Sequence, residues 1–125
     1  MNAYNFFTAQ LRFAASKTER SDVDIDAMMQ LLNAIADQID AHGSFHVEAK
    51  NMRTSARALA GVAGFLQQHI LPEVIAAKNN VGEQQVRWTI DTAMSVMAMM
   101  MTHAEMTHDQ DDLDVTLPSP PTPLN

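Results

Sequence analysis

Apolar residues recur along this chain in alternating steps of three and four, the spacing that gathers side chains on one face of an α-helix. Three long series have this spacing, and a shorter one opens the chain. The series are Tyr4, Phe7, Leu11, Ala14; Ile25, Met28, Leu32, Ile35, Ile39; Met52, Ala56, Leu59, Ala63, Leu66, Ile70; and Val86, Ile90, Ala93, Met97, Met100, Ala104. Before the C-terminal tail, no segment sustains the two-residue alternation of a strand. The pattern predicts an all-α protein.

Breaker and capping residues mark the ends of the predicted helices. Gly43 is a helix stop, and Ser44 is then the N-cap of the next helix, with His46 in its first turn. Asn80 caps the fourth helix. Pro72 removes a backbone donor, so we expect the third helix to kink or restart there. Because the connections are short, we expect an antiparallel bundle of four main helices.

The C-terminal segment differs in composition from the rest of the chain. We expect a helical bundle domain over residues 1–110 and an extended, acidic and Pro-rich tail over residues 111–125. Its "DLDVTL" alternates polar and apolar residues, as a strand does, and its "PSPPTP" favours polyproline II. Composition alone favours disorder. A tail that is held would pack Leu113, Val115 and Leu117 across the bundle, or add as a strand to a partner.

Composition narrows the class of protein. The chain is 46% hydrophobic and 18% charged, which is typical of a globular domain and not of a disordered one. It has no signal-peptide pattern, and its longest apolar run is far below the ~20 residues of a membrane span. The net charge of −7 opposes general nucleic-acid binding, which requires clustered cations. We expect a soluble cytoplasmic protein that contacts neither nucleic acid nor membrane.

Methionine, histidine and carboxylate residues are concentrated in residues 94–112. His103 and His108 lie about 140° apart around a helix, so they do not form a chelating pair. Met99, His103 and Met106 lie on one side, and thioether with imidazole is a plausible Cu(I) ligand set. Methionines at helical spacing more often fill a core, because the flexible thioether adapts to irregular gaps. We therefore expect no metal and no cofactor.

A basic stripe formed by Lys50, Arg53 and Arg57 stands out on an acidic protein. Such a stripe is usually solvated or pairs with a neighbouring acidic helix, here through Asp37 and Asp40. The alternative is a docking strip for an acidic partner.

The segment "ARALAGVAG", residues 56–64, has unusually small side chains, which allow two helix axes to approach closely. The partner helix is either within the bundle or in a second copy of the chain.

The fourth helix is apolar on nearly every side over residues 93–101. A surface helix needs an apolar stripe of only about 100° to face its core, so Val96 and Met99 need additional cover. The Pro72 segment, the tail or a second chain could supply it, and we expect a homodimer through this helix. Trp88 lies off the main stripe, either as second-layer core or as an interface anchor.

No catalytic pattern is present: the chain has no nucleophile elbow, no Gly-rich phosphate loop and no cysteine. We therefore expect no catalytic residues and a non-enzymatic protein that acts by protein–protein contact. An adaptor fits, as does an inhibitor of the kind that mobile elements encode. The alternative is a Met/His copper-binding protein.

Overall fold

The computed structural model describes residues 4–17 and 23–121. In these residues the regular elements are helices apart from two short strands, which confirms the all-α prediction. The elements are α1 (Asn5–Lys17), α2 (Val23–His42), β1 (Ser44–Val47), a 3₁₀ turn (Ala49–Asn51), α3 (Met52–Phe65), a π-helical turn (Leu66–Ile70), α4 (Leu71–Ala76), α5 (Asn80–Met106) and β2 (Leu113–Thr116).

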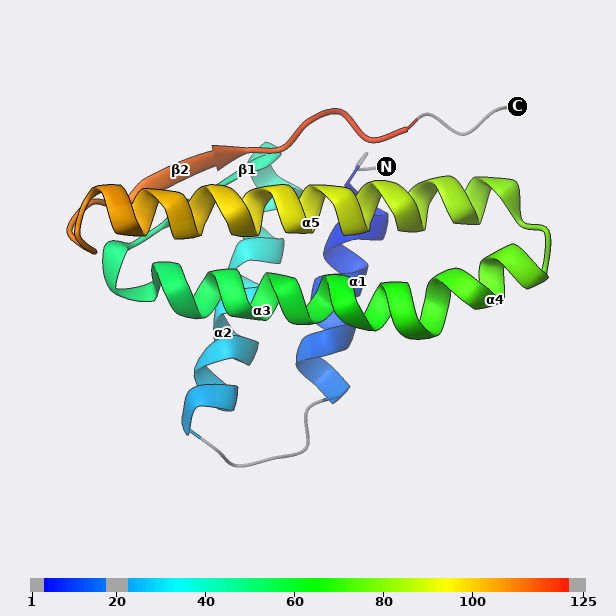
Figure 1. Cartoon of the computed structure of the whole chain (residues 1–125), viewed down its shortest axis with the longest axis horizontal. Coiled ribbons are helices and arrows are strands. Elements are labelled where there is room, and N and C mark those ends of the chain that lie inside the picture. Colours follow the sequence, from blue (N-terminus) through cyan, green and yellow to red (C-terminus); the bar gives the residue numbers. More distant parts are fainter. Residues whose placement is uncertain (1–3, 18–22, 122–125) are drawn as a thin grey trace.

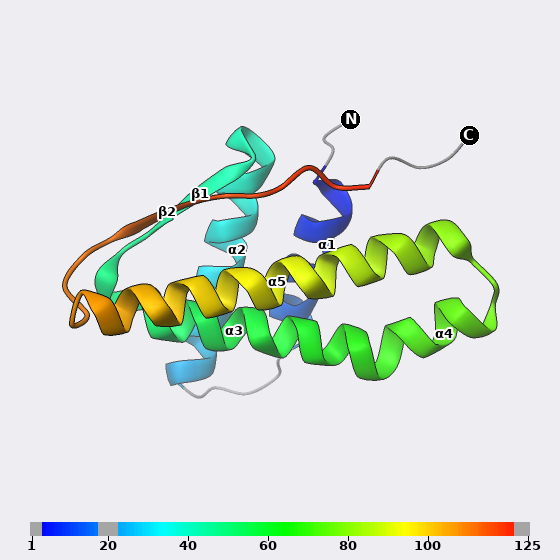
Figure 2. The same ribbon diagram turned by 45° about the horizontal axis from the view of Figure 1, so that its top comes forward.

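The main helices form two antiparallel hairpins that cross each other. Figure 1 shows α3 and α5 running side by side in opposite directions, with α4 continuing the line of α3. The hairpin of α1 and α2 crosses behind them at a steep angle, and Figure 2 shows the same crossing from a second direction. α1 with α2 and α3 with α5 are thus antiparallel as expected, but α2 crosses α3 steeply, so the four helices do not form one antiparallel bundle.

The core lies where the apolar spacing places it. Leu59 is 1% exposed and Ile90 is 8% exposed, and most other members of the predicted series are buried as well. Met28, Ile70 and Met97 are half-buried and pack against this core. The structure does not describe the side chain of Ile25.

The small residues of α3 serve packing within the chain. Ala56 and Ala63 are 0% and 1% exposed, and α3 makes its main contact with α5. Gly61 and Gly64 point elsewhere, since a Cβ added at either position would meet nothing within 4 Å. The partner helix of this segment is therefore α5 of the same chain, which accounts for the buried alanines.

The third helix restarts at the proline as predicted. Its regular α-helical hydrogen bonding ends at Phe65, five residues form the π-helical turn, and α4 begins at Leu71 with Pro72 in its first turn. Proline is tolerated there because the first turn of a helix does not need its missing N–H.

Gly43 ends α2, but the chain beyond it is not a helix. Gly43 has φ +71°, and a Cβ at this position would lie 3.0 Å from Cε2 of Tyr4, so a residue with a side chain would be strained and crowded. The prediction of Ser44 as an N-cap with His46 in a first helical turn is wrong. Both residues belong to strand β1 instead.

The cap of α5 lies one residue earlier than predicted. The side-chain oxygen of Asn79, not that of Asn80, accepts a hydrogen bond of 2.9 Å from the backbone N–H of Gly82.

The tail returns along the domain and pairs with β1. The two strands are antiparallel, with Phe45 opposite Val115. Val115 and Leu117 are 1% and 4% exposed, and Leu113 packs half-buried beside them. Alternation in "DLDVTL" therefore marks a strand whose apolar face covers the chain's own core.

Truncating the core should unfold the protein more readily. We expect Leu59→Ala to lower the free energy of unfolding by about 2 to 4 kcal/mol, because it removes buried methyl groups and leaves a cavity. Ile75→Ala, at a position 45% exposed, is the control and should change it by no more than about 0.5 kcal/mol. Urea denaturation measures both; equal effects would mean that the core is misplaced.

Candidate functional site

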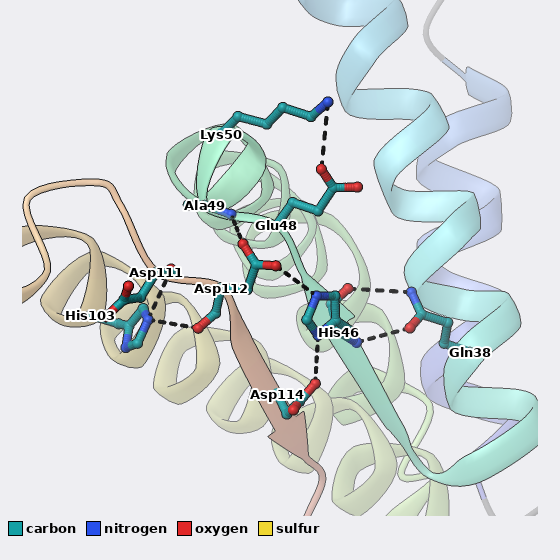
Figure 3. A network of polar contacts seen from close by, with 9 residues as sticks. All are labelled: Gln38, His46, Glu48, Ala49, Lys50, His103, Asp111, Asp112 and Asp114. Carbon is teal, nitrogen blue, oxygen red and sulfur yellow. Dashed lines mark hydrogen bonds and ion pairs between the residues drawn. The ribbon is translucent and has the colours of Figure 1, made fainter.

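A cluster of His46, Asp112 and Asp114 joins the two strands, and we call it the carboxylate clasp. Nδ1 of His46 lies 2.7 Å from a carboxylate oxygen of Asp114, and Nε2 lies 3.1 Å from one of Asp112. Strand register explains the first contact, because His46 and Asp114 are directly opposite in the antiparallel ladder. Figure 3 shows the imidazole between the two carboxylates.

Electrostatics favour the charged forms of His46 and Asp112. Ionised carboxylates only accept hydrogen bonds, so an imidazole that faces one with each nitrogen is best satisfied as the cation. Hydrogen bonds to Asp114 and then to Asp112 raise the pKa of His46 above its ordinary value of 6.5. The backbone N–H of Ala49, at 2.7 Å, and then His46 lower the pKa of Asp112.

Neighbouring helices fix the clasp in place. The Gln38 side chain of α2 accepts a hydrogen bond of 2.8 Å from the backbone N–H of His46. Nε2 of His103 on α5 donates to the carbonyl oxygens of Asp111 and Asp112, at 3.1 and 3.0 Å (Figure 3). Because the imidazole nitrogens of His46 are both engaged by carboxylates, the arrangement fastens the tail to the domain.

The basic stripe divides into residues with different partners. Lys50 lies 3.5 Å from Glu48, and Arg53 binds Asp109 at 2.8 Å, in the turn that leads to the tail. Arg57 is exposed and forms no ion pair with any described residue.

The expected pairing of the stripe with the acids of α2 is wrong. Arg12 of α1 binds Asp37 at 2.6 Å and Asp40 at 2.8 Å. The helix crossing brings α1, and not the stripe, to these carboxylates.

Several candidates for partner contact are covered by the chain itself. Val96 is 4% exposed, and Val115 and Leu117 of the tail are themselves buried against the core, so none of them is available at the surface. Trp88 is half-buried, with its ring centroid 5.7 Å from that of Phe7 and 6.4 Å from that of Tyr4. Trp88 therefore belongs to the second layer of the core.

The three copper-ligand candidates lie on one side of α5. Met99 and Met106 are 47% and 77% exposed, and Nε2 of His103 is occupied by the tail carbonyls. No group of three or more His, Cys, Asp or Glu within residues 4–17 and 23–121 is suited to hold a metal ion.

An uncharged strip on the outside of α5 is the clearest candidate contact surface. Between Asp91 and Glu105, the exposed residues are Met94, Ser95, Ala98, Met99 and Thr102, and we call these five the outer strip. The strip is about 12 Å long at 1.5 Å per residue. Met94, Ala98 and Met99 fall within residues 93–101, which the sequence marks as apolar on nearly every side, whereas Ser95 and Thr102 are polar and give no such signal.

Comparison of the chain with models of known protein families, with curated proteins and with solved structures finds no match. In the part of the chain that the structure describes, no helix combines the length and apolarity needed to cross a bilayer.

The clasp should make the tail sensitive to pH. Because the pKa of His46 is raised, its contribution is fully present below 6.5 and is lost as the pH rises through the raised value. Because the pKa of Asp112 is lowered, its contribution is present above 3.8 and is lost as the pH falls through the lowered value.

We therefore expect the slowest hydrogen exchange of the Leu117 amide, corrected for the intrinsic rate, between pH 3.8 and 6.5, with faster exchange above. NMR measures this rate. His46→Gln should remove the increase on the alkaline side; an increase that survives this change would assign it to another group.

We expect the Met/His stretch to bind no copper. An ion that bound the native state at a hundredfold excess over its Kd would add about 2.7 kcal/mol of stability. Thermal denaturation with and without Cu(I) should show no such gain. Met99→Leu with Met106→Leu, which conserves volume and retains His103 as the anchor of the tail, is the matched variant. A copper-dependent rise in Tm that this variant abolishes would establish a soft-metal site.

Proposed function

We propose that this is a non-enzymatic protein that acts by protein–protein contact, as an adaptor or an inhibitor, with the outer strip as its contact surface. The observation that carries the proposal is the exposure of uncharged side chains over about two turns of α5. Met94 and Met99 are 42% and 47% exposed there, on a protein with a net charge of −7. Electrostatic repulsion opposes close contact over most of an acidic surface. The uncharged outer strip is therefore where another protein can approach at the lowest electrostatic cost.

The shape of the outer strip suits another helix. Ser95, Ala98 and Thr102 follow steps of three and four, so these small residues form one line along α5. Met94 and Met99 are about 140° apart and flank that line on either side. A second helix can approach the small residues closely while the adaptable methionine side chains pack around it.

A second copy of the chain is the partner that we propose first. Symmetric dimers are the commonest oligomers, and a two-fold axis places the same strip on both sides of the interface. Like charges of two acidic copies would oppose contact elsewhere, but the strip itself has no charge to repel. A partner protein that presents a similar helix would then bind the same outer strip in place of the second copy.

Replacing Ala98 by arginine should abolish the dimer. Light scattering coupled to size exclusion at micromolar concentration should give a dimer mass for the wild type and a monomer mass for Ala98→Arg. An unpaired charge at a buried contact costs about 2 to 5 kcal/mol, which weakens the dimer at least about thirtyfold.

The matched control is Gln84→Arg, which adds the same charge to an exposed position of the same helix outside the strip. It should remain dimeric. A wild type that is monomeric under these conditions would contradict the homodimer, and an Ala98→Arg dimer as stable as the wild type would remove the outer strip from the interface.

A further inference from the structure

A groove of about 360 Å³ opens between α1, α2 and α3, away from the outer strip. Its walls include Phe13 of α1, Met28 and Met29 of α2, and Phe65 of α3. Figure 1 shows the second half of α1 and the first half of α2 running past α3, and these are the parts that contribute to the groove. The crossing of the two hairpins thus produces an apolar recess at their edge.

The aromatic walls of the groove are exposed. Phe13 and Phe65 are 44% and 40% exposed, with ring centroids 6.1 Å apart. Between the walls, α3 has a glycine: a Cβ at Gly61 would meet nothing within 4 Å. The missing side chain leaves room beside the rings, and apolar surface of this kind favours an apolar occupant that removes it from water.

One charged residue lines the groove among the described residues, and it is Arg57. Three other arginines of the described chain are engaged, Arg12 and Arg53 with aspartates of other segments and Arg87 with Glu83 of its own helix. Arg57 has no such partner, so its guanidinium is available for a carboxylate, which it can bind with two parallel hydrogen bonds.

We propose that this groove binds a small amphiphilic anion, a fatty-carboxylate type of ligand whose apolar chain lies between Phe13 and Phe65 and whose carboxylate meets Arg57. The volume falls in the range of small-molecule sites. On α3 the lining runs from residue 57 to residue 65, about 12 Å. Residues of α1, α2 and α3 wall this recess, which suits a small ligand that they enclose, whereas a docked partner helix needs a face that is open along its axis, as the outer strip is.

Decanoate is the first probe, measured by isothermal titration calorimetry on the full chain. Binding should tighten about fourfold for each methylene added from octanoate to dodecanoate, because each buried methylene gains the same transfer free energy. Decanol should bind more weakly than decanoate, because it has no charge for Arg57. A chain-length series with no trend, or equal binding of the alcohol and the acid, would overturn the proposal.

Two variants, Gly61→Leu and then Arg57→Gln, test where decanoate binds, and Gly64→Leu is the control for the first. Gly61→Leu should fill the groove and weaken decanoate binding at least tenfold, whereas Gly64→Leu, in the same helix with equally open space but outside the lining, should not. Arg57→Gln should weaken decanoate but leave decanol unchanged, and this second variant decides the matter if Gly61→Leu does not fold. Unchanged decanoate binding in folded Gly61→Leu would overturn the proposal. Tighter binding of an acidic amphipathic peptide than of dodecanoate, lost in the same variant, would also overturn it in favour of a protein partner.

Discussion

Close packing of α3 against α5 is the contact on which the rest of the structure depends. Ala56 and Ala63 on α3 and Ala93 on α5 are almost wholly buried, and such short side chains let two helices lie close together along their length. α5 has 27 residues and α3 has 14, so α5 extends beyond its main partner. A two-layer protein covers the inward side of α5 only, and the outer strip is the consequence of that geometry.

The tail completes the domain at the edge that the helices leave uncovered. A two-stranded ladder is marginal by itself, so β1 and β2 need support from the helices. Val115 and Leu117 supply it by burial, and the clasp adds charge pairing around His46. The clasp is half exposed to water, where such pairs contribute little energy, so its main effect is to fix the register of the strand rather than to hold the whole domain together.

The spacing of apolar residues predicted those features of the fold that depend on the local sequence alone. The core series and the restart at Pro72 follow from spacing and backbone chemistry, and both are present. Strand β1 was missed because "SFHV" is too short to show a period, and its partner is far along the chain, with His46 opposite Asp114. The partner of Asp37 was also missed, since spacing along one helix says nothing about the angle at which α1 crosses it. Contacts between elements, and therefore the groove and the clasp, required the three-dimensional arrangement.

The two proposed surfaces differ in charge. The outer strip has no charged residue, and the groove has one among the described residues, Arg57. Three of the four arginines in the described residues are engaged within the chain, as Arg53 is with Asp109, whereas Arg57 is not. The outer strip and the groove lie on different helices and share no residue. Changes at Ala98 and Gly61 should therefore combine additively, because both positions are exposed and lie on different helices. Contact through α5 and ligand binding beside α3 can then be measured as separate properties of one folded chain.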